Sequence, residues 1–212
     1  EYAQAATLFV PTDLPEPGAP GYQKALEATL IDLFRATGGR ALALFTSLSQ
    51  LNTTYRAIAK PLEEDDVFVI AQNLDGSRRQ VLETFKTQDR TVLLGTRSFW
   101  EGIDVAGEAL SCLVIARLPF SVPSDPVFAA RSETFEDSFA QYAVPEAVLR
   151  FRQGFGRLIR SKKDRGIVVV LDKRVLSKNY GRIFIESLPP VGKYQGPLKE
   201  LPGFAGKFLN GS

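Results

Sequence analysis

Two arginines, a glutamine and two glycines lie close together in the segment Gln153-Gly-Phe-Gly-Arg157-Leu-Ile-Arg160. A guanidinium group is always charged and matches phosphate oxygens with a rigid fork, so paired arginines indicate a polyanionic ligand or a phosphoryl-transfer site. Each interior glycine costs a helix roughly 1 kcal/mol relative to alanine. Gly154 and Gly156 therefore need a local reason, such as the close approach of a ligand or another backbone.

A helix through this segment would separate its polar and apolar side chains. At about 100° per residue, Gln153, Arg157 and Arg160 fall on one side of the helix. The opposite side carries the apolar residues Phe151, Phe155, Leu158 and Ile159. Seven cations between Arg150 and Arg165 accompany the single acidic residue Asp164, an excess of six charges that would attract phosphate. Taken alone, the pattern also fits a solvated cationic face on an ordinary amphipathic helix.

A second polar segment follows the apolar run Thr91–Leu94. It reads Gly95-Thr-Arg-Ser-Phe-Trp-Glu-Gly-Ile-Asp-Val-Ala-Gly107 and combines hydroxyls, aromatic rings, two carboxylates and three glycines. In α/β sheets, ligands bind at the carboxyl ends of strands. Aromatic rings beside hydroxyls suit single-stranded nucleic acid, whereas Glu101 and Asp104 are better suited to hold an arginine, a water or a metal-bound ligand. The alternative is a tight loop in which both carboxylates cap local backbone groups.

The composition excludes several other kinds of chemistry. The sequence contains no histidine, which removes histidine-based triads, proton shuttles and HExxH metal sites. Its single cysteine, Cys112, lies in an apolar run, so this chain alone forms no disulfide framework, zinc cluster or iron–sulfur cluster. Apolar runs are too short to cross a bilayer and no secretory leader is visible, so we expect an intracellular, cytoplasmic protein. Because the chain has no methionine and begins at Glu1, we interpret it as a segment of a larger protein.

The elements that would position these segments follow from alternating apolar runs and helical patterns. Nearly continuous apolar runs are typical of strands covered on both faces of a parallel sheet, and we expect strands at Thr7–Val10, Ala41–Phe45, Val67–Ala71, Thr91–Leu94, Leu110–Ala116 and Ile167–Leu171. Helical patterns occupy Tyr22–Ala36, Leu48–Ala59, Ser77–Thr87, Asp125–Tyr142, Pro145–Ser161 and Tyr180–Leu188. Ser47 and Gln50 predict a capping box. The alternation predicts a three-layer α/β domain with a mainly parallel sheet.

Several ordered segments resemble the motifs of a known family. Gly95–Gly107 looks like the fifth motif of superfamily-two helicases, and Gln153–Arg160 looks like their sixth motif. Phe45–Leu51 is similar to the fourth motif. Together with Leu118-Pro-Phe120, Leu171-Asp-Lys-Arg174, Tyr180-Gly181 and Leu188-Pro189, these segments are similar to the DinG branch of the XPD-like DNA helicases, from about Thr7 to Pro190.

The resemblance implies a second RecA-like motor domain over residues 1–190, with a helical excursion at about 120–145 and an irregular tail over 191–212. A phosphate-binding loop G-x-x-x-x-G-K-[ST] is missing, because Gly192-Lys193 is followed by Tyr194 and Gly206-Lys207 by Phe208. ATP and Mg²⁺ would therefore be bound mainly by an absent first motor domain. The family's iron–sulfur cysteines would also belong to that absent part.

Roles for individual residues are implied by the resemblance. Arg157 and Arg160 would act as arginine fingers on ATP, and Gln153 would orient the attacking water or sense the γ-phosphate. Residues implied at the nucleotide site, or in its coupling to DNA, are Gly156, Glu101, Gly102 and Asp104. Candidates for contacting single-stranded DNA are Thr46, Ser47, Thr96, Ser98 and Trp100. The implied function is the C-terminal half of a 5′–3′ ATP-dependent DNA helicase that acts in DNA repair or in replication. Its implied partners are single-stranded DNA, ATP and its own N-terminal motor domain, and no membrane.

Two other functions are weighed against this one. The chain would be a catalytically silent nucleic-acid-binding or interaction module if it were attached to another enzyme, such as an exonuclease. The complete set of Gln153, Arg157 and Arg160 argues against a silent module. A small α/β metabolic enzyme with a phosphate site would explain the alternation of strands and helices, but it would not explain the order of the motifs.

Overall fold

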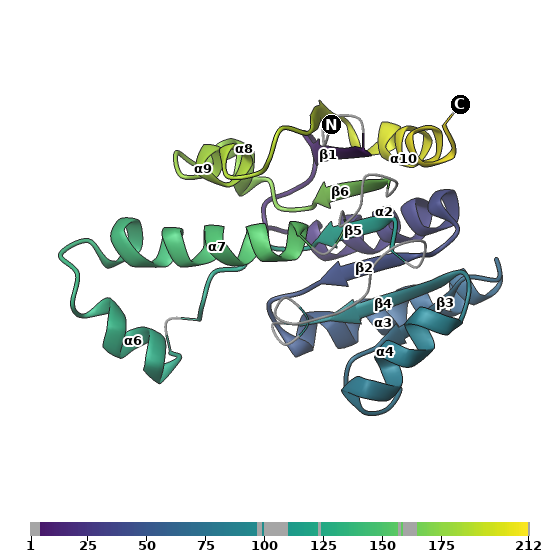
Figure 1. The fold of residues 1–212 in the computed structure, drawn as a ribbon, viewed down its shortest axis with the longest axis horizontal. Coiled ribbons are helices and arrows are strands. Elements are labelled where there is room, and N and C mark those ends of the chain that lie inside the picture. The colour runs from purple at the N-terminus through teal and green to yellow at the C-terminus, as the bar shows by residue number, and fades with distance from the viewer. Residues whose placement is uncertain are drawn as a thin grey trace.

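One parallel sheet organises the chain (Figure 1). The computed structural model describes residues 5–96, 99, 110–122, 124–156, 158 and 165–211. Within them the strands are β1 (Ala6–Pro11), β2 (Ala41–Leu44), β3 (Phe68–Ala71), β4 (Thr91–Gly95), β5 (Cys112–Ile115), β6 (Gly166–Val170) and β7 (Gly192–Gly196). Their order is β3-β4-β2-β5-β6-β1-β7, and every adjacent pair is parallel. The six predicted strands are confirmed, each within two residues.

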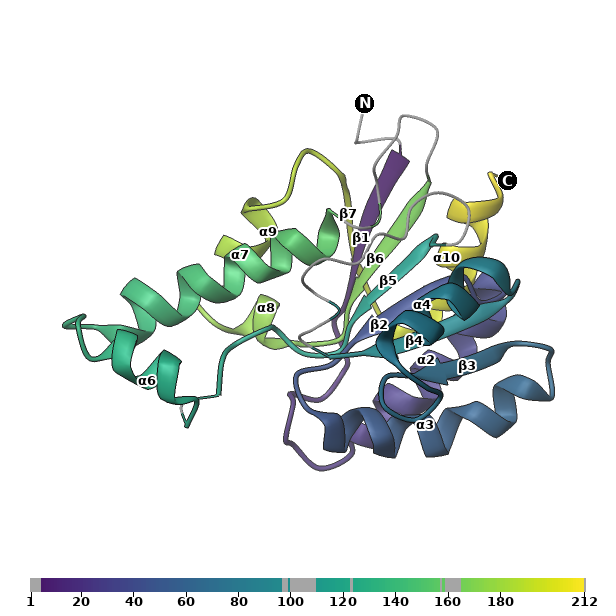
Figure 2. The ribbon, with the colours of Figure 1, turned by 60° about the horizontal axis from the view of Figure 1, so that its bottom comes forward.

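Helices cover both faces of the sheet (Figure 2). One face is covered by α2 (Tyr22–Thr37), α3 (Leu48–Glu63) and α10 (Leu201–Asn210), and the other by α4 (Arg78–Thr87), α7 (Val144–Phe155) and α9 (Gly181–Glu186). The short helix α8 (Arg174–Ser177) precedes α9, whereas α6 (Pro126–Ser132) and the π-helix η2 (Phe139–Ala143) project away from the sheet in both views. Among the described helices, none is long and apolar enough to cross a membrane. The predicted three-layer α/β architecture is confirmed.

The strands are apolar on both sides because both sides are covered. Successive strand side chains point to opposite faces. Leu8 and Val10 pack in the cluster beneath α7, while Phe9 between them packs in the cluster beneath α2. Cys112 is fully buried in the second cluster, and burial raises the pKa of its thiol, as fits a core residue. The two edge strands are the exceptions, because Phe68 of β3 remains 39% exposed and the central residues of β7 are exposed.

Local capping explains where two helices begin. The Ser47 hydroxyl accepts the backbone N–H of Gln50 at 3.2 Å, which is the first half of the predicted capping box of α3. A reciprocal box forms instead at α4, where Ser77 accepts the N–H of Gln80 and the Gln80 side chain accepts the N–H of Ser77. Two orphan donors at the start of α4 are thereby satisfied.

The chain after Pro190 is ordered, which corrects the predicted irregular tail. Strand β7 pairs with β1, and α10 packs against α2 with Leu201 and Ala205 buried. The Phe204 ring lies 5.3 Å from the ring of Phe9. The prolines and glycines of this segment predicted a loop. Long-range backbone pairing with β1 and this ring contact instead stabilise a strand and a helix. Because β7 is an edge strand with exposed central residues, it carries no apolar run to reveal it.

Two predicted helices are shorter than expected. Helix α7 ends at Phe155 rather than Ser161, with Gly156 as its C-cap. Glycine is a poor helix former, so a second glycine directly after Phe155 favours the end of the helix there. The predicted helix over Asp125–Tyr142 is divided into α6 and η2. Helix α8 was not predicted.

We expect Gly39→Ala to destabilise the fold strongly. Gly39 has φ +79°, and an added Cβ would lie 2.4 Å from the carbonyl carbon of Arg90. The unfavourable backbone conformation and the clash should together lower the free energy of unfolding by roughly 2–4 kcal/mol, measured by urea denaturation. Gly203→Ala is the matched control, because Gly203 lies in α10 with nothing within 4 Å of an added Cβ. Equal stability of the two variants would contradict this account of Gly39.

Candidate nucleotide and nucleic-acid site

Candidate DNA-contacting residues gather at the edge of the sheet that is formed by the carboxyl ends of the strands. Thr46 and Ser47 follow β2, and Thr96 follows the adjacent strand β4. The N–H of Phe45 donates to the carbonyl oxygen of Gly95 at 2.9 Å, which joins the two strand ends. Thr46 and Thr96 are half-buried and Ser47 is exposed. Ser98 and Trp100 lie outside the described residues.

Gln72 is a further polar group at this edge that the sequence analysis did not single out. It directly follows β3, and its side-chain oxygen accepts the backbone N–H of Thr96 at 2.8 Å and the Thr96 hydroxyl at 2.9 Å. The carbonyl oxygen of Thr96 accepts the N–H of Phe99 at 2.8 Å. The Phe99 ring is fully buried, so the start of the Gly95–Gly107 segment is anchored to the core.

Helix α7 carries the first three residues of the Gln153–Arg160 segment, and Gly156 is its C-cap. Gln153 and Gly156 are exposed, whereas Gly154 is buried. A surface pocket of about 450 Å³ is lined by Leu149, Arg152, Gln153, Phe155, Gly156, Ser187, Leu188 and Pro189. Gln153 and Gly156 are therefore brought together at one hollow. Arg157, Arg160, Glu101, Gly102 and Asp104 lie outside the described residues.

Arg150 does not contribute to a phosphate-binding surface. Its guanidinium lies 2.6 Å from the Glu146 carboxylate and donates to the Ser121 hydroxyl at 2.7 Å. The Arg150 side chain is only 8% exposed. Its charge is thus paired inside the fold. Arg150 must therefore be subtracted from the excess of positive charge that the sequence predicted for this segment.

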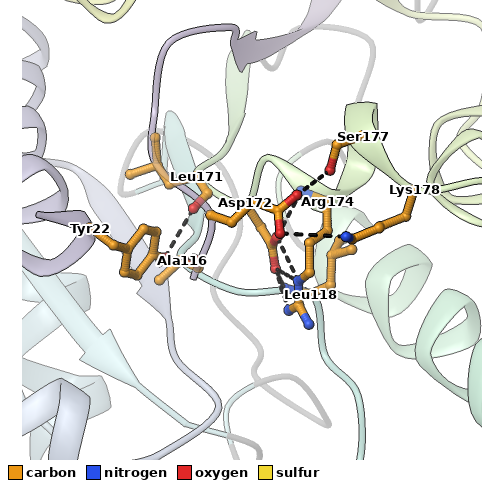
Figure 3. A network of polar contacts seen from close by, with 9 residues as sticks. Tyr22, Ala116, Leu118, Leu171, Asp172, Arg174, Ser177 and Lys178 are labelled. Atoms are coloured by element: carbon orange, nitrogen blue, oxygen red, sulfur yellow. Dashed lines mark hydrogen bonds and ion pairs between the residues drawn. The ribbon is translucent and has the colours of Figure 1, made fainter. Parts of the chain in front are cut away.

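A buried carboxylate joins the carboxyl ends of β5 and β6 (Figure 3). Asp172 is fully buried just after β6, and it accepts the N–H of Leu118, which follows β5, at 2.8 Å. It also accepts the N–H of Arg174 at 3.1 Å and the Nη2 group of the same residue at 2.6 Å. These bonds to Asp172 raise the pKa of the Arg174 guanidinium above its ordinary value. The guanidinium therefore stays charged, and it donates to both oxygens of this one carboxylate.

The same network connects three of the short segments that carried the family resemblance. The Arg174 guanidinium carbon lies 5.7 Å from the centre of the Phe120 ring, and Phe120 meets Tyr180 edge-on at 5.4 Å. Gly181 lets α9 approach α8 closely, since an added Cβ would lie 2.2 Å from the carbonyl oxygen of Val175. Leu118–Phe120, Leu171–Arg174 and Tyr180–Gly181 thus form one structural unit beyond the carboxyl ends of β5 and β6.

Tyr22 closes this unit from the opposite face of the sheet. Its hydroxyl lies between the carbonyl oxygens of Ala116 and Leu171, and the bond to Leu171 measures 3.0 Å (Figure 3). Burial raises the pKa of the Tyr22 hydroxyl, and the nearby negative charge of Asp172 raises it further. The hydroxyl therefore remains protonated and able to donate. No sequence motif pointed to Tyr22, because its partners are backbone atoms far along the chain.

Two solved structures resemble this chain in fold. The structure "XPD_APO" matches 90% of this chain and 40% of its own with a TM-score of 0.68 and 19% identity. The structure of S. cerevisiae Dbp5 bound to RNA and ADP BeF3 matches 97% of this chain and 46% of its own, with a TM-score of 0.58 and 18% identity. At these identities the likeness establishes the fold alone, which is that of a RecA-like helicase domain.

Sequence comparison defines the family. The family model for the helicase C-terminal domain matches residues 30–191, which is 162 of 212 residues, and the chain belongs to this family. ATP-dependent DNA helicase YoaA of Haemophilus influenzae is 38% identical over 89% of this chain and 29% of its own length. ATP-dependent helicase DinG of Mycobacterium tuberculosis H37Rv is 37% identical over 90% of this chain and 29% of its own length. The 3′-5′ exonuclease DinG of Bacillus subtilis is 39% identical over 78% of this chain and 18% of its own length. The chain spans less than a third of each of these relatives.

We expect Asp172→Ala to destabilise the domain by about 3 kcal/mol, because the N–H of Leu118 and the Arg174 guanidinium lose their acceptor. Asp65→Ala is the matched control, since Asp65 pairs with Arg35 at a site where both side chains are more than 40% exposed. That exposed pair should contribute less than about 1 kcal/mol. Urea denaturation of the two variants measures the difference. A loss for Asp172→Ala no larger than for Asp65→Ala would refute the structural role of Asp172.

Proposed function

We propose that this chain is the second motor domain of an ATP-dependent DNA helicase that moves 5′ to 3′ along single-stranded DNA. One observation carries the proposal. In a chain of the helicase C-terminal family, the segments resembling the fourth and fifth motifs begin at neighbouring strand ends of a RecA-like sheet, and the segment resembling the sixth follows in order. A motor of this kind would act on DNA in the cytoplasm, in repair.

The proposed chemistry is stabilisation of charge during ATP hydrolysis. ATP and Mg²⁺ would be held mainly by the first motor domain, and Arg157 and Arg160 would reach them across the cleft between the domains. Arginine fingers stabilise the charge that spreads over the γ-phosphoryl oxygens. Gln153, exposed beside Gly156, would orient the attacking water or sense the γ-phosphate.

Nucleic-acid contacts would lie at the neighbouring strand ends. Thr46, Ser47 and Thr96 are the described members of this set, and Ser98 and Trp100 would extend it. Glu101, Gly102 and Asp104 would couple the nucleotide site to these contacts. Closure of the two motor domains on ATP, and their opening after hydrolysis, would move the strand relative to the first domain.

A second candidate function is a catalytically silent nucleic-acid-binding module within a nuclease. One observation favours it, because the Bacillus subtilis relative is named a 3′-5′ exonuclease. The presence of Gln153, Arg157 and Arg160 supports the motor instead. A silent module would bind DNA without ATP turnover, and this difference separates the two functions.

Arg157→Ala and Arg160→Ala, introduced into the full-length protein, test the motor. We expect each variant to lower DNA-stimulated ATP hydrolysis by about 10³-fold or more, the effect of losing an arginine finger. Turnover is measured by phosphate release at saturating DNA. Arg56→Ala is the matched control, because Arg56 is exposed on α3, away from α7. Parental turnover in both test variants would exclude the finger assignment.

The 212-residue chain by itself should show no appreciable ATPase activity, because its sequence has no phosphate-binding loop. The measurement is phosphate release by rigorously purified protein with Mg²⁺ and single-stranded DNA. Robust Mg²⁺-dependent turnover that co-purifies with this chain would mean that the nucleotide site lies within it. In that case the division of labour between two motor domains would be incorrect.

A further inference from the structure

Gln72 occupies the next place in the row of polar residues at the sheet edge. Strands β3, β4 and β2 are consecutive in the sheet, so the residues that follow them are also neighbours. Gln72 follows β3, Thr96 follows β4 and Thr46 follows β2. A strand of nucleic acid that passes Thr46 and Thr96 would therefore reach Gln72 next.

Contacts with Thr96 determine which way the Gln72 amide faces. The oxygen and nitrogen of a glutamine amide are usually assigned from their hydrogen bonds. Here the backbone N–H and the hydroxyl of Thr96 lie 2.8 and 2.9 Å from the same Gln72 atom. A backbone N–H can only donate, so that atom must be the oxygen. The NH₂ group of Gln72 consequently lies on the other branch of the amide, directed away from these two donors.

Both hydrogen-bond donors of Thr96 are already engaged, so neither is available to a phosphate. Phosphate oxygens of a nucleic-acid backbone accept hydrogen bonds and have no proton to donate. Both donors of Thr96 are directed at Gln72, and its carbonyl oxygen accepts the N–H of Phe99. Thr96 in this arrangement cannot donate to a phosphate without releasing Gln72. The Gln72 NH₂ group, in contrast, offers two protons.

The backbone around Gln72 is held firmly. Its N–H donates to the carbonyl oxygen of Leu94 at 3.0 Å, which extends the pairing of β3 with β4. The carboxylate of Asp75 accepts the N–H of Ala71 at 2.8 Å, and this bond closes the turn that follows. The capping box at Ser77 then starts α4. A donor held in this way loses little conformational freedom when it binds a ligand.

We propose that Gln72 is a nucleic-acid-contacting residue whose amide NH₂ group donates to a phosphate oxygen of the bound single strand. Thr96 is the positioning residue that turns this amide toward the ligand. The inference rests on the proposed function and refines the part that Thr96 plays in it. The contact recognises the sugar–phosphate backbone, so it carries no sequence preference.

Gln72→Glu in the full-length protein tests the contact. A carboxylate has the same shape and still accepts both Thr96 donors, but it has no N–H to offer a phosphate. The affinity for a fluorescently labelled oligothymidylate should fall roughly 10- to 100-fold, as expected for loss of a hydrogen bond to a charged group. Gln80→Glu is the matched control: it makes the same charge change eight residues away, and its carboxylate can still accept the Ser77 N–H. Gln80→Glu should bind within about twofold of the parent.

Gln72→Leu provides a second, uncharged test. It removes the NH₂ group and also frees both donors of Thr96. We expect roughly tenfold weaker binding, with thermal unfolding measured in parallel to verify that the variant is folded. Parental or tighter binding by Gln72→Leu would show that Thr96 itself binds the strand, and equal affinities for Gln72→Glu and Gln80→Glu would also overturn the proposal. Absence of DNA binding by the parental protein would instead refute the proposed function.

Discussion

Parallel pairing is the constraint on which the rest of the structure depends. Every adjacent pair in the sheet runs in the same direction, so all the carboxyl ends of the strands share one edge. Each connection between parallel strands crosses a face of the sheet. The inner strands are therefore buried on both sides, which accounts for their continuous apolar runs. Thr46, Thr96 and Gln72 come from segments far apart in sequence, and they become neighbours only because of this pairing.

Several residues that support the family resemblance hold neighbouring strand ends together. Asp172 accepts the N–H of Leu118 and the guanidinium of Arg174, which ties the ends of β5 and β6. An unpaired carboxylate at this depth would be costly, so its partners are as necessary as the carboxylate. Tyr22 adds a hydrogen bond from the other face of the sheet. This support lies at the ends of β5 and β6, and β5 is the neighbour of β2, whose end carries proposed DNA contacts.

Strand positions were predictable because burial on two faces leaves a clear apolar run, as in Ile167–Leu171. The ordered segment after Pro190 was not predictable, because β7 is an edge strand and gains its order from pairing with β1. Arg150 illustrates the same difficulty for charge. In the sequence it belongs to a cationic cluster, whereas in the fold its guanidinium donates hydrogen bonds to Glu146 and Ser121. Residue type alone does not reveal whether a charge is paired.

The sequence by itself determined the class of architecture, the order of the motifs and the candidate residues, because apolar periodicity and local residue types are properties of short segments. Only the tertiary structure decided that Asp172 joins two strand ends and that Gln72 engages both donors of Thr96. The physical reason is that hydrogen bonds depend on distance and direction in space. Gln72 and Thr96 are 24 positions apart, and the pairing of β3 with β4 alone brings them into contact.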